Sequence, residues 1–466
     1  MFLAEKPADI LVSAREDTDF ARVTAVTLAI EGIRAADPVK AVKGYVEISG
    51  NEILLRDGAR IPLRGQIVVV GAGKATGGMA KAVEELFGDR ISRGVIAVPE
   101  PLAEVYSREF RRVEVVPSTH PRTSEKSLEA GRRVLEAVKG LSEEDLVIAL
   151  FSGGGSALLE YPVEGVGIEE IAETSILLMK AGADIFELNT VRKHLSRIKG
   201  GWLARHLQPA ACLTLMISDV VGDRMDTIAS GPTVPDPTTF EDALNVISKY
   251  GLRDSVPRSV IEYLEAGKEG KAPETPKPGD PIFSRVYNRI VASNRISLEA
   301  MAEKARSMGY NVLILTSMLE GEAREVGKVV ASIAKEIRSS GRPLPPPAVV
   351  LLGGETTVTV RGSGVGGRNQ ELALSAAISI RGWDRVAILS LGSDGRDGPT
   401  DVAGAVVDGY TYEKALSMGL RPEEFLERND SYNFFKQVGG HVTTGYTGTN
   451  VNDFVIVVVE KEKAWD

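Results

Sequence analysis

The sequence contains a single cysteine, Cys212, and this excludes several kinds of site. One cysteine cannot form an intrachain disulfide or a cysteine-ligated metal cluster. Histidine is also scarce, and its four positions (120, 194, 206 and 441) show no metal-ligand spacing. The sequence therefore supports neither a zinc site nor a Cys–His nucleophile.

Long apolar runs and an excess of positive charge are also missing. No run approaches the length that spans a membrane, and the opening MFLAEKPADI lacks the cationic and apolar segments of a secretory signal, so we expect a cytoplasmic protein with no membrane partner. The net charge of -9 argues against a nucleic-acid partner. Any anion site must therefore come from local cations and backbone N–H groups. Glutamine, found only at positions 66, 208, 370 and 437, is scarce enough to favour a thermophilic source.

Apolar runs of strand length alternate with helical patterns along most of the 466 residues. Such alternation predicts doubly wound parallel sheets, in which ligands bind at the carboxyl ends of the strands. The length allows two to three domains. We predict two α/β domains with an active-site cleft between them: a Rossmann-like domain over residues 1–266 and a second over residues 282–466. The polar segment 267–281, rich in proline and glycine, would be a linker or an exposed loop.

The first glycine-rich turn, GAGKATGG, follows a buried strand and leads into a helix. It contains Gly71 and Gly73, but Thr76 stands where a dinucleotide-binding fingerprint has its third glycine. Lys74 lies at the start of the helix, where a cation opposes the helix dipole unless it meets an anion. We therefore predict that Lys74 contacts a phosphate, with a solvated lysine as the alternative.

A second turn, SGGGS, follows another buried strand. Consecutive backbone N–H groups and two hydroxyls suit an anion nest. The turn is not a G-x-S-x-G elbow, so neither serine is expected to be a hydrolase nucleophile. A tight turn that allows strand and helix to pack closely is the alternative. The predicted nest consists of Ser152, Gly153, Gly154, Gly155 and Ser156.

Two loops rich in carboxylates follow buried strands. Asp219 comes directly after one strand, where a general base or a Mg²⁺ ligand would lie. Asp394 follows a later strand, and we predict that it contacts Mg²⁺ or a substrate hydroxyl. Structural roles in caps and turns are the alternative, and they explain the neighbouring Asp223, Asp226 and Asp397 equally well.

The stretch Leu351–Ala377 is the most informative in the second half of the chain. An apolar strand turns on two glycines into Glu355, and a second strand-like piece, TVTV, leads into a loop with four glycines. Arg368 closes this loop just before a helix that begins near Asn369. A guanidinium beside a helix start suits a phosphate or a carboxylate. A surface hairpin with a flexible tip is the alternative.

Two further polar segments contribute candidates of unequal weight. TGYTGTNVNDF places Thr449 and Asn450 before the last strand, where short hydroxyl and amide groups suit a sugar-like or hydroxy-acid ligand. The basic run Arg192-Lys193-His194 is better explained as a solvated helix face than as a ligand site.

Seven motifs, in order from about Gly71 to Phe454, resemble those of the MOFRL-type glycerate kinases. They are GAGKATGGMAKA, IALFSGGGSALL, LNTVRKHLSRIKGG, ISDVVGDRMDTIASGPTVPD, GGETTV with GGRNQELAL, LGSDGRDGPTDVAG and TGTNVNDF. The resemblance implies phosphorylation of D-glycerate by ATP, usually at the 2-hydroxyl, with Mg²⁺. The site residues that it implies are Lys74, Asp219, Glu355, Arg368, Asp394 and Asn450.

These observations together predict direct in-line phosphoryl transfer. Lys74 and Arg368 would neutralise developing charge, and Asp219 or Asp394 would accept the proton of the attacking hydroxyl. The other aspartate, with Glu355, would help to hold Mg²⁺. An NAD(P)H-dependent hydroxypyruvate reductase is the main alternative, although the third fingerprint glycine is missing, and a ligand sensor is another. The sequence leaves open which domain holds ATP and whether the protein is a homodimer.

Overall fold

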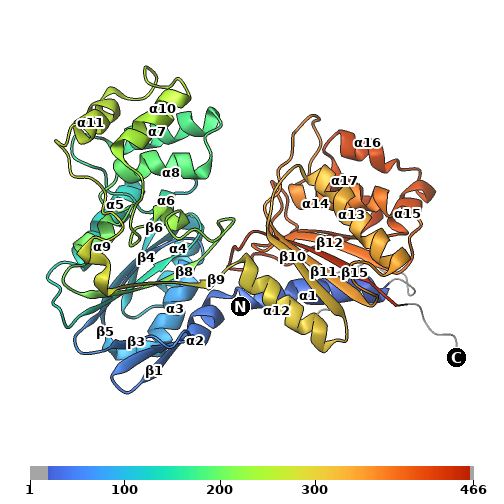
Figure 1. Ribbon diagram of the computed structural model, residues 1–466, viewed down its shortest axis with the longest axis horizontal. Coiled ribbons are helices and arrows are strands. Elements are labelled where there is room, and N and C mark those ends of the chain that lie inside the picture. Colours follow the sequence, from blue (N-terminus) through green and yellow to red (C-terminus); the bar gives the residue numbers. More distant parts are fainter. Residues whose placement is uncertain (1–18, 462–466) are drawn as a thin grey trace. The chain divides into compact units, whose positions relative to one another are not determined.

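The computed structural model describes residues 19–461 (Figure 1). The chain divides into two units: one contains helix α1 (Asp19–Ala35) and the chain from Ala292 onward, and the other is Pro38–Val291. These boundaries differ from the predicted ones, because α1 groups with the later unit and residues 267–281 lie within the earlier one. Within the described part of the chain, no helix has the length and apolar character needed to cross a membrane.

The sheet of the earlier unit has the strand order of a Rossmann fold. Its order is β6-β5-β4-β7-β8-β9, which is 3-2-1-4-5-6 counted along the sheet's own strands, and the pairs from β6 to β8 are parallel. The predicted doubly wound sheet is confirmed. The order reverses between β4 and β7, which places a ligand crevice beyond their carboxyl ends. The strands are β4 (Ile67–Ala72), β5 (Ile91–Pro99), β6 (Val113–Ser118), β7 (Leu146–Phe151), β8 (Ala211–Ile217) and β9 (Val286–Ala292).

Helices and a small hairpin sheet complete this unit. Four helices, α7, α8, α10 and α11, share a separate apolar cluster that includes Ile171, Leu188 and Leu264. The three-stranded sheet is β1 (Val46–Ser49), β2 (Glu52–Leu55) and β3 (Arg60–Pro62). The helices are α2 (Pro38–Tyr45), α3 (Thr76–Phe87), α4 (Glu100–Ser107), α5 (Glu125–Ala137), α6 (Gly155–Leu158), α7 (Ile168–Lys180), α8 (Ile185–His194), α9 (Trp202–His206), α10 (Phe240–Lys249) and α11 (Arg258–Lys268).

The later unit is also α/β, as predicted, but its sheet is mixed. The order is β10-β11-β15-β12-β13-β14, and β15 runs antiparallel to both β11 and β12. The carboxyl ends of β11 and β12 therefore lie on either side of the start of β15. The strands are β10 (Asn311–Leu319), β11 (Ala348–Gly354), β12 (Val386–Gly392), β13 (Gly404–Asp408), β14 (His441–Val442) and β15 (Asp453–Val459).

The predicted second strand over the TVTV segment is wrong. Residues 357–360 form no strand, and only Thr357 makes an isolated bridge, to Glu322. The Glu322 carboxylate accepts the backbone N–H and the hydroxyl of Thr359, so a side chain takes the place of a partner strand.

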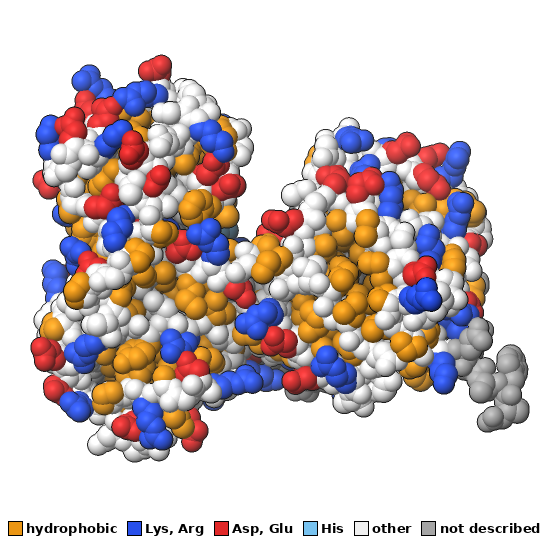
Figure 2. Space-filling model, viewed as in Figure 1, with side chains coloured by type: hydrophobic (Ala, Val, Ile, Leu, Met, Phe, Trp, Pro, Cys, Tyr) orange, Lys and Arg blue, Asp and Glu red, His pale blue; other side chains and the backbone are white. Residues whose placement is uncertain are grey.

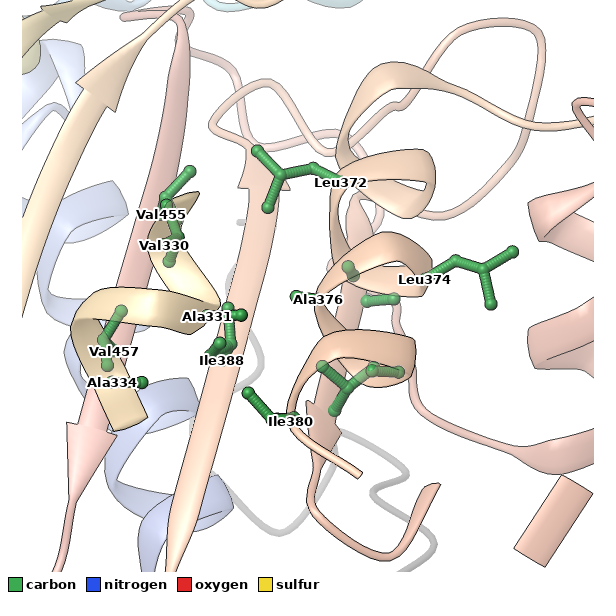
Figure 3. Packing of buried hydrophobic residues seen from close by; sticks show 14 of the residues in the cluster. Val330, Ala331, Ala334, Leu372, Leu374, Ala376, Ile380, Ile388, Val455 and Val457 are labelled. Carbon is green, nitrogen blue, oxygen red and sulfur yellow. The ribbon is translucent and has the colours of Figure 1, made fainter. Parts of the chain in front are cut away.

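The core of the later unit lies between its sheet and two helices, α13 (Ala323–Ser340) and α14 (Arg368–Ser379). In Figure 3, Val330 and Ala334 of α13 lie beside Val455 and Val457 of β15. Helix α1 and α12 (Asn294–Ser307) lie on the opposite side of this sheet from α13 and α14 (Figure 1). The remaining helices are α15 (Thr411–Ser417), α16 (Pro422–Glu427) and α17 (Ser431–Val438).

Acidic and basic side chains are interspersed on the face of each unit drawn in Figure 2. Many form exposed pairs such as Arg132 with Glu129, which contribute little to stability. Attraction of an anion must therefore depend on particular cations, as the composition predicts.

Candidate functional site

The two predicted glycine-rich turns meet at the point where the strand order reverses. The turn after β4 and the turn after β7 are bonded to each other: Lys74 N donates to Gly153 O at 2.9 Å, and Ala75 N donates to Ser152 Oγ at 3.0 Å. Ser152 also shares a hydrogen bond with Thr76 Oγ1 at 3.2 Å. The loops are thus locked together at the expected ligand crevice.

Several of the predicted glycines are required by close packing. A Cβ on Gly71 would lie 2.2 Å from Leu150 O, and one on Gly73, whose φ is +149°, would lie 2.1 Å from Ser152 Oγ. A Cβ on Gly155 would lie 2.7 Å from the Cβ of Ala229. These contacts explain glycine at all three positions without a ligand, so their predicted role in nucleotide binding remains a prediction.

Three chemically active side chains surround the SGGGS turn. A Cβ on Gly153 would lie 1.9 Å from Asp219 Oδ2, and one on Gly154 would lie 3.3 Å from His120 Nε2 and 3.5 Å from Lys74 Cγ. Lys74 and Asp219 are half-buried. His120 is partly exposed, but the protein around its ring removes much of the surrounding water. This desolvation, together with the charges of Lys74 and Arg192, lowers the pKa of His120 to about 4, so the ring is neutral at pH 7.

The interpretation of the basic run 192–194 as a solvated helix face is wrong. The side chains of Lys193 and His194 are 1% and 0% exposed, and Arg192 is also buried. Lys193 Nζ lies 3.5 Å from Asp226 Oδ2 and 3.4 Å from Asp236 Oδ1. Every residue of this helix from Leu188 to His194 is buried, so charge alone gave the wrong prediction.

The second set of predicted residues lies at one edge of the mixed sheet. Glu355 follows β11, Asp394 follows β12 by two residues, and Asp453 begins β15 opposite the last residues of both strands. Arg368, the first residue of α14, joins them: Nε and Nη2 donate to Asp453 at 2.5 and 3.0 Å, and Nη1 donates to Glu355 Oε1 at 2.7 Å. The structure thus brings Arg368 and Glu355 together, with Asp394 nearby on the same edge.

Asp453 is a functional candidate that the sequence analysis missed. Burial raises the pKa of Asp453 to about 6, although Arg368 opposes this shift. Burial also disfavours the charge of Arg368, but the hydrogen bonds and charge of Asp453 prevail and raise the pKa of Arg368. The carboxylate therefore fixes the orientation of the guanidinium. The sequence NDF, in which Asp453 is the first residue of the last strand, was the signal that could have identified it.

The neighbouring Asp397 has a structural role. Its two oxygens accept from the backbone N–H groups of Asn369 and Gln370 at 3.0 and 2.9 Å and from both side-chain amides. It thus caps the start of α14. Asp394 is half-buried and accepts one backbone hydrogen bond, from Arg396 N at 3.0 Å.

The predicted ligand residues before β15 include one unsatisfied group. Thr449 is 2% exposed, and among the described residues its Oγ1 has no hydrogen-bond partner. Asn450 is half-buried, and its Oδ1 accepts from Asn452 N at 3.1 Å. A buried hydroxyl without a partner is uncommon in folded proteins and is consistent with a ligand contact.

The four-glycine loop borders a cavity of about 560 Å³. The loop is held by Asn429, whose Oδ1 accepts the N–H groups of Arg361 and Gly362 at 2.7 and 3.0 Å. The cavity is lined by apolar groups, among them Val358 and Pro399, and by the ion pair of Arg368 and Glu355. The loop is thus anchored, whereas the alternative interpretation expected a flexible tip.

In the described part of the chain, no three His, Cys, Asp or Glu side chains are close enough together to form a metal site. Mg²⁺ does not require such a cluster, because it commonly binds through one or two carboxylates, water and substrate phosphates. The half-buried Asp219 and Asp394 and the exposed Glu355 have suitable oxygen donors.

Two family models match the chain: a domain of unknown function, DUF4147, over residues 24–265, and the MOFRL family over residues 348–453. The chain is 43% identical to a protein named glycerate 2-kinase from Pyrococcus horikoshii, over 95% of this chain and 98% of that one. It is 45% identical to a D-glycerate 2-kinase from Thermotoga maritima, over 84% and 91% of the two chains. A crystal structure of glycerate kinase from Thermotoga maritima matches with a TM-score of 0.83 at 41% identity, covering 95% of this chain and all of that one. The chain therefore belongs to the DUF4147/MOFRL family of glycerate 2-kinases.

Proposed function

We propose that this protein transfers the γ-phosphoryl group of ATP to the 2-hydroxyl of D-glycerate, giving 2-phosphoglycerate and ADP. The observation that carries the proposal is the position of the charged residues. Lys74 and Asp219 lie at the switch point of the Rossmann sheet, and Arg368 and Asp394 lie at one edge of the mixed sheet, in a chain whose relatives are glycerate 2-kinases.

The proposed mechanism is in-line displacement, in which the protein positions groups and neutralises charge. Lys74 and Arg368 stabilise negative charge on the transferred group. Asp219 or Asp394 accepts the proton of the attacking hydroxyl, and the glycine-rich turn donates backbone hydrogen bonds to an anionic group. Asp453 acts through Arg368 by holding its planar guanidinium in one orientation.

Mg²⁺ is proposed as the cofactor, with Asp219, Glu355 and Asp394 as the residues that would supply carboxylate ligands. When bound, it would neutralise charge on the phosphates of ATP. ATP is a cytoplasmic metabolite, and a cytoplasmic location is part of this proposal. A homodimer remains compatible with it.

The alternative hydroxypyruvate reductase receives no support from the first glycine-rich turn. A dinucleotide fingerprint needs a third glycine for close helix–strand packing. Thr76 fills this position, is 0% exposed, and bonds to Leu150 O and Ser152 Oγ.

The test is the product formed from D-glycerate, ATP and Mg²⁺, identified by phosphorus NMR. We expect 2-phosphoglycerate. Formation of 3-phosphoglycerate would refute the regiochemistry and retain the kinase. Untouched ATP together with oxidation of NADH by hydroxypyruvate would replace the kinase by the reductase.

A further inference from the structure

Arg192 is a buried cation with unused hydrogen-bonding capacity. It lies on α8 and is 9% exposed. Among the described residues its guanidinium has one hydrogen bond, from Nε to Ser175 Oγ at 3.0 Å, and its two terminal nitrogens are not among the buried polar atoms without a partner, so they remain accessible. Because most of the side chain is buried while these two nitrogens are accessible, the guanidinium is placed to pair with a ligand of opposite charge.

The helix that carries Arg192 is joined to the SGGGS turn. Asn189, one turn earlier, shares a face with Arg192. Its Oδ1 accepts from Ser230 Oγ at 2.9 Å, and Ser230 in turn shares a hydrogen bond of 2.7 Å with Ser156 Oγ, the last residue of the turn. His120, beside Gly154, is influenced by the charges of both Lys74 and Arg192. Arg192 and the turn therefore converge on one region.

Glu160, the carboxylate whose charge acts on Arg192, is already paired with another residue. Glu160 and Lys199 are 1% and 0% exposed and form an ion pair of 2.5 Å. The other oxygen of Glu160 accepts from Tyr161 N at 3.0 Å. Because Lys199 holds Glu160, this carboxylate makes no ion pair with Arg192. The two terminal nitrogens of a guanidinium match the two oxygens of a carboxylate.

We propose that Arg192 binds the carboxylate of the substrate acid together with the SGGGS turn. It thereby determines the preference of the enzyme for hydroxy acids over neutral alcohols. This inference rests on the proposed function for the identity of the acid. A phosphate group of the nucleotide is the competing anion, and the test separates the two.

The experiment compares the full-length wild type with Arg192→Gln, Arg192→Lys and the control Arg197→Gln, which changes an exposed arginine five residues along the chain. Calorimetry with D-glycerate alone should show binding weakened about 10- to 100-fold in Arg192→Gln, because this variant loses the hydrogen-bonded charge. Binding should weaken less in Arg192→Lys, which keeps the charge and loses only the forked geometry of the guanidinium. The KM for ATP should not change, and any phosphorylation of glycerol, which has no carboxylate, should be the same in all variants. Arg197→Gln should match the wild type.

Unchanged binding of D-glycerate by Arg192→Gln would overturn the inference, and so would a raised KM for ATP, which would assign Arg192 to a phosphate. If the glutamine variant does not fold, the lysine variant decides by the same measurements. Binding is measured without nucleotide. A wild type that binds D-glycerate through Arg192 without phosphorylating it would therefore refute the proposed function and retain this inference.

Discussion

Replacing Gly153 by alanine would test whether Asp219 acts where the structure holds it. The new Cβ would lie 1.9 Å from Asp219 Oδ2 and 2.5 Å from its Cγ. Gly153 is not among the residues with positive φ, so the backbone accepts alanine, and the three atoms nearest the new Cβ all belong to Asp219. An ordinary contact needs about 3.5 Å, so the carboxylate must move by roughly 1.5 Å.

A displacement of this size should reduce kcat/KM by about 100-fold or more, because catalytic groups tolerate little misplacement. Stability should fall by only about 1–3 kcal/mol, as for other overpacked positions. The assay is ADP release from ATP with D-glycerate, together with thermal unfolding. Gly44→Ala is the matched control, since Gly44 lies in helix α2 with nothing within 4 Å of its Cβ position, and it should leave activity unchanged.

A double-variant cycle makes the reasoning refutable. If the alanine acts by displacing the carboxylate, Gly153→Ala combined with Asp219→Asn should be no slower than Asp219→Asn alone. Multiplied losses in the double variant would show that the alanine acts by another route. Near-normal turnover of Gly153→Ala would remove Asp219 from the proposed mechanism.

Three other outcomes follow from the same contacts. Arg368→Lys should lower kcat at least about tenfold in the ADP-release assay, because an ammonium cannot make the forked bonds to two carboxylates, and activity near wild type would refute its role. Lys199→Met should destabilise the fold by about 3–5 kcal/mol in denaturant unfolding, and adding Glu160→Gln should restore part of this, since both groups of the pair are buried; no restoration would contradict the pairing. Burial opposes the charge of Glu274, but the hydrogen bond and charge of His194 prevail and lower the pKa of Glu274 to about 2. The pKa of Glu274 in the folded protein lies below the unfolded value of 4.5, so this stabilisation is complete above about pH 4.5 and is lost as the pH falls toward 2. Between pH 4.5 and 2, the Tm of Glu274→Gln should therefore fall less than the Tm of the wild type. Equal falls in Tm would refute the linkage.

The strands were predictable because burial on both faces produces continuous apolar runs. Ile67–Ala72 and Leu146–Phe151 are buried at every position, and both were recognisable from their composition alone. The insertion of β15 between β11 and β12 was not predictable, because strand pairing depends on contacts between distant segments. The prediction for the TVTV segment was wrong for a related reason: the segment has the alternation of a strand, but within residues 19–461 it makes only one isolated bridge and joins no sheet.

Most of the predicted side chains of the site share one local feature. Lys74, Asp219, Glu355 and Asp394 all lie within two residues of the end of a buried strand, and strand ends can be read from sequence. Asp453 lies at the start of a strand, and its partner is 85 residues away along the chain.

Arg192 illustrates a different limit of sequence reasoning. A run of three basic residues on a helix normally indicates a solvated face. Here the partners of the run come from several distant segments, and they bury all three side chains. The periodicity of a helix shows which residues share a face, but it does not show how many faces other elements cover.

The two sets of charged residues differ in sign, and this difference has a chemical consequence. Around Arg368 lie three carboxylates, those of Glu355, Asp394 and Asp453, against one guanidinium, so this edge of the sheet repels a bare anion. A phosphate chain becomes compatible with such a site when a divalent cation accompanies it. Around the SGGGS turn, by contrast, Lys74 and Arg192 exert positive charge on the ring of His120, which is neutral at pH 7, and Asp219 is the carboxylate beside Gly153. The surroundings of the turn are therefore less negative than the edge around Arg368. Of the two sets, charge alone therefore makes the edge around Arg368 the one that needs a divalent cation before it can bind an anion.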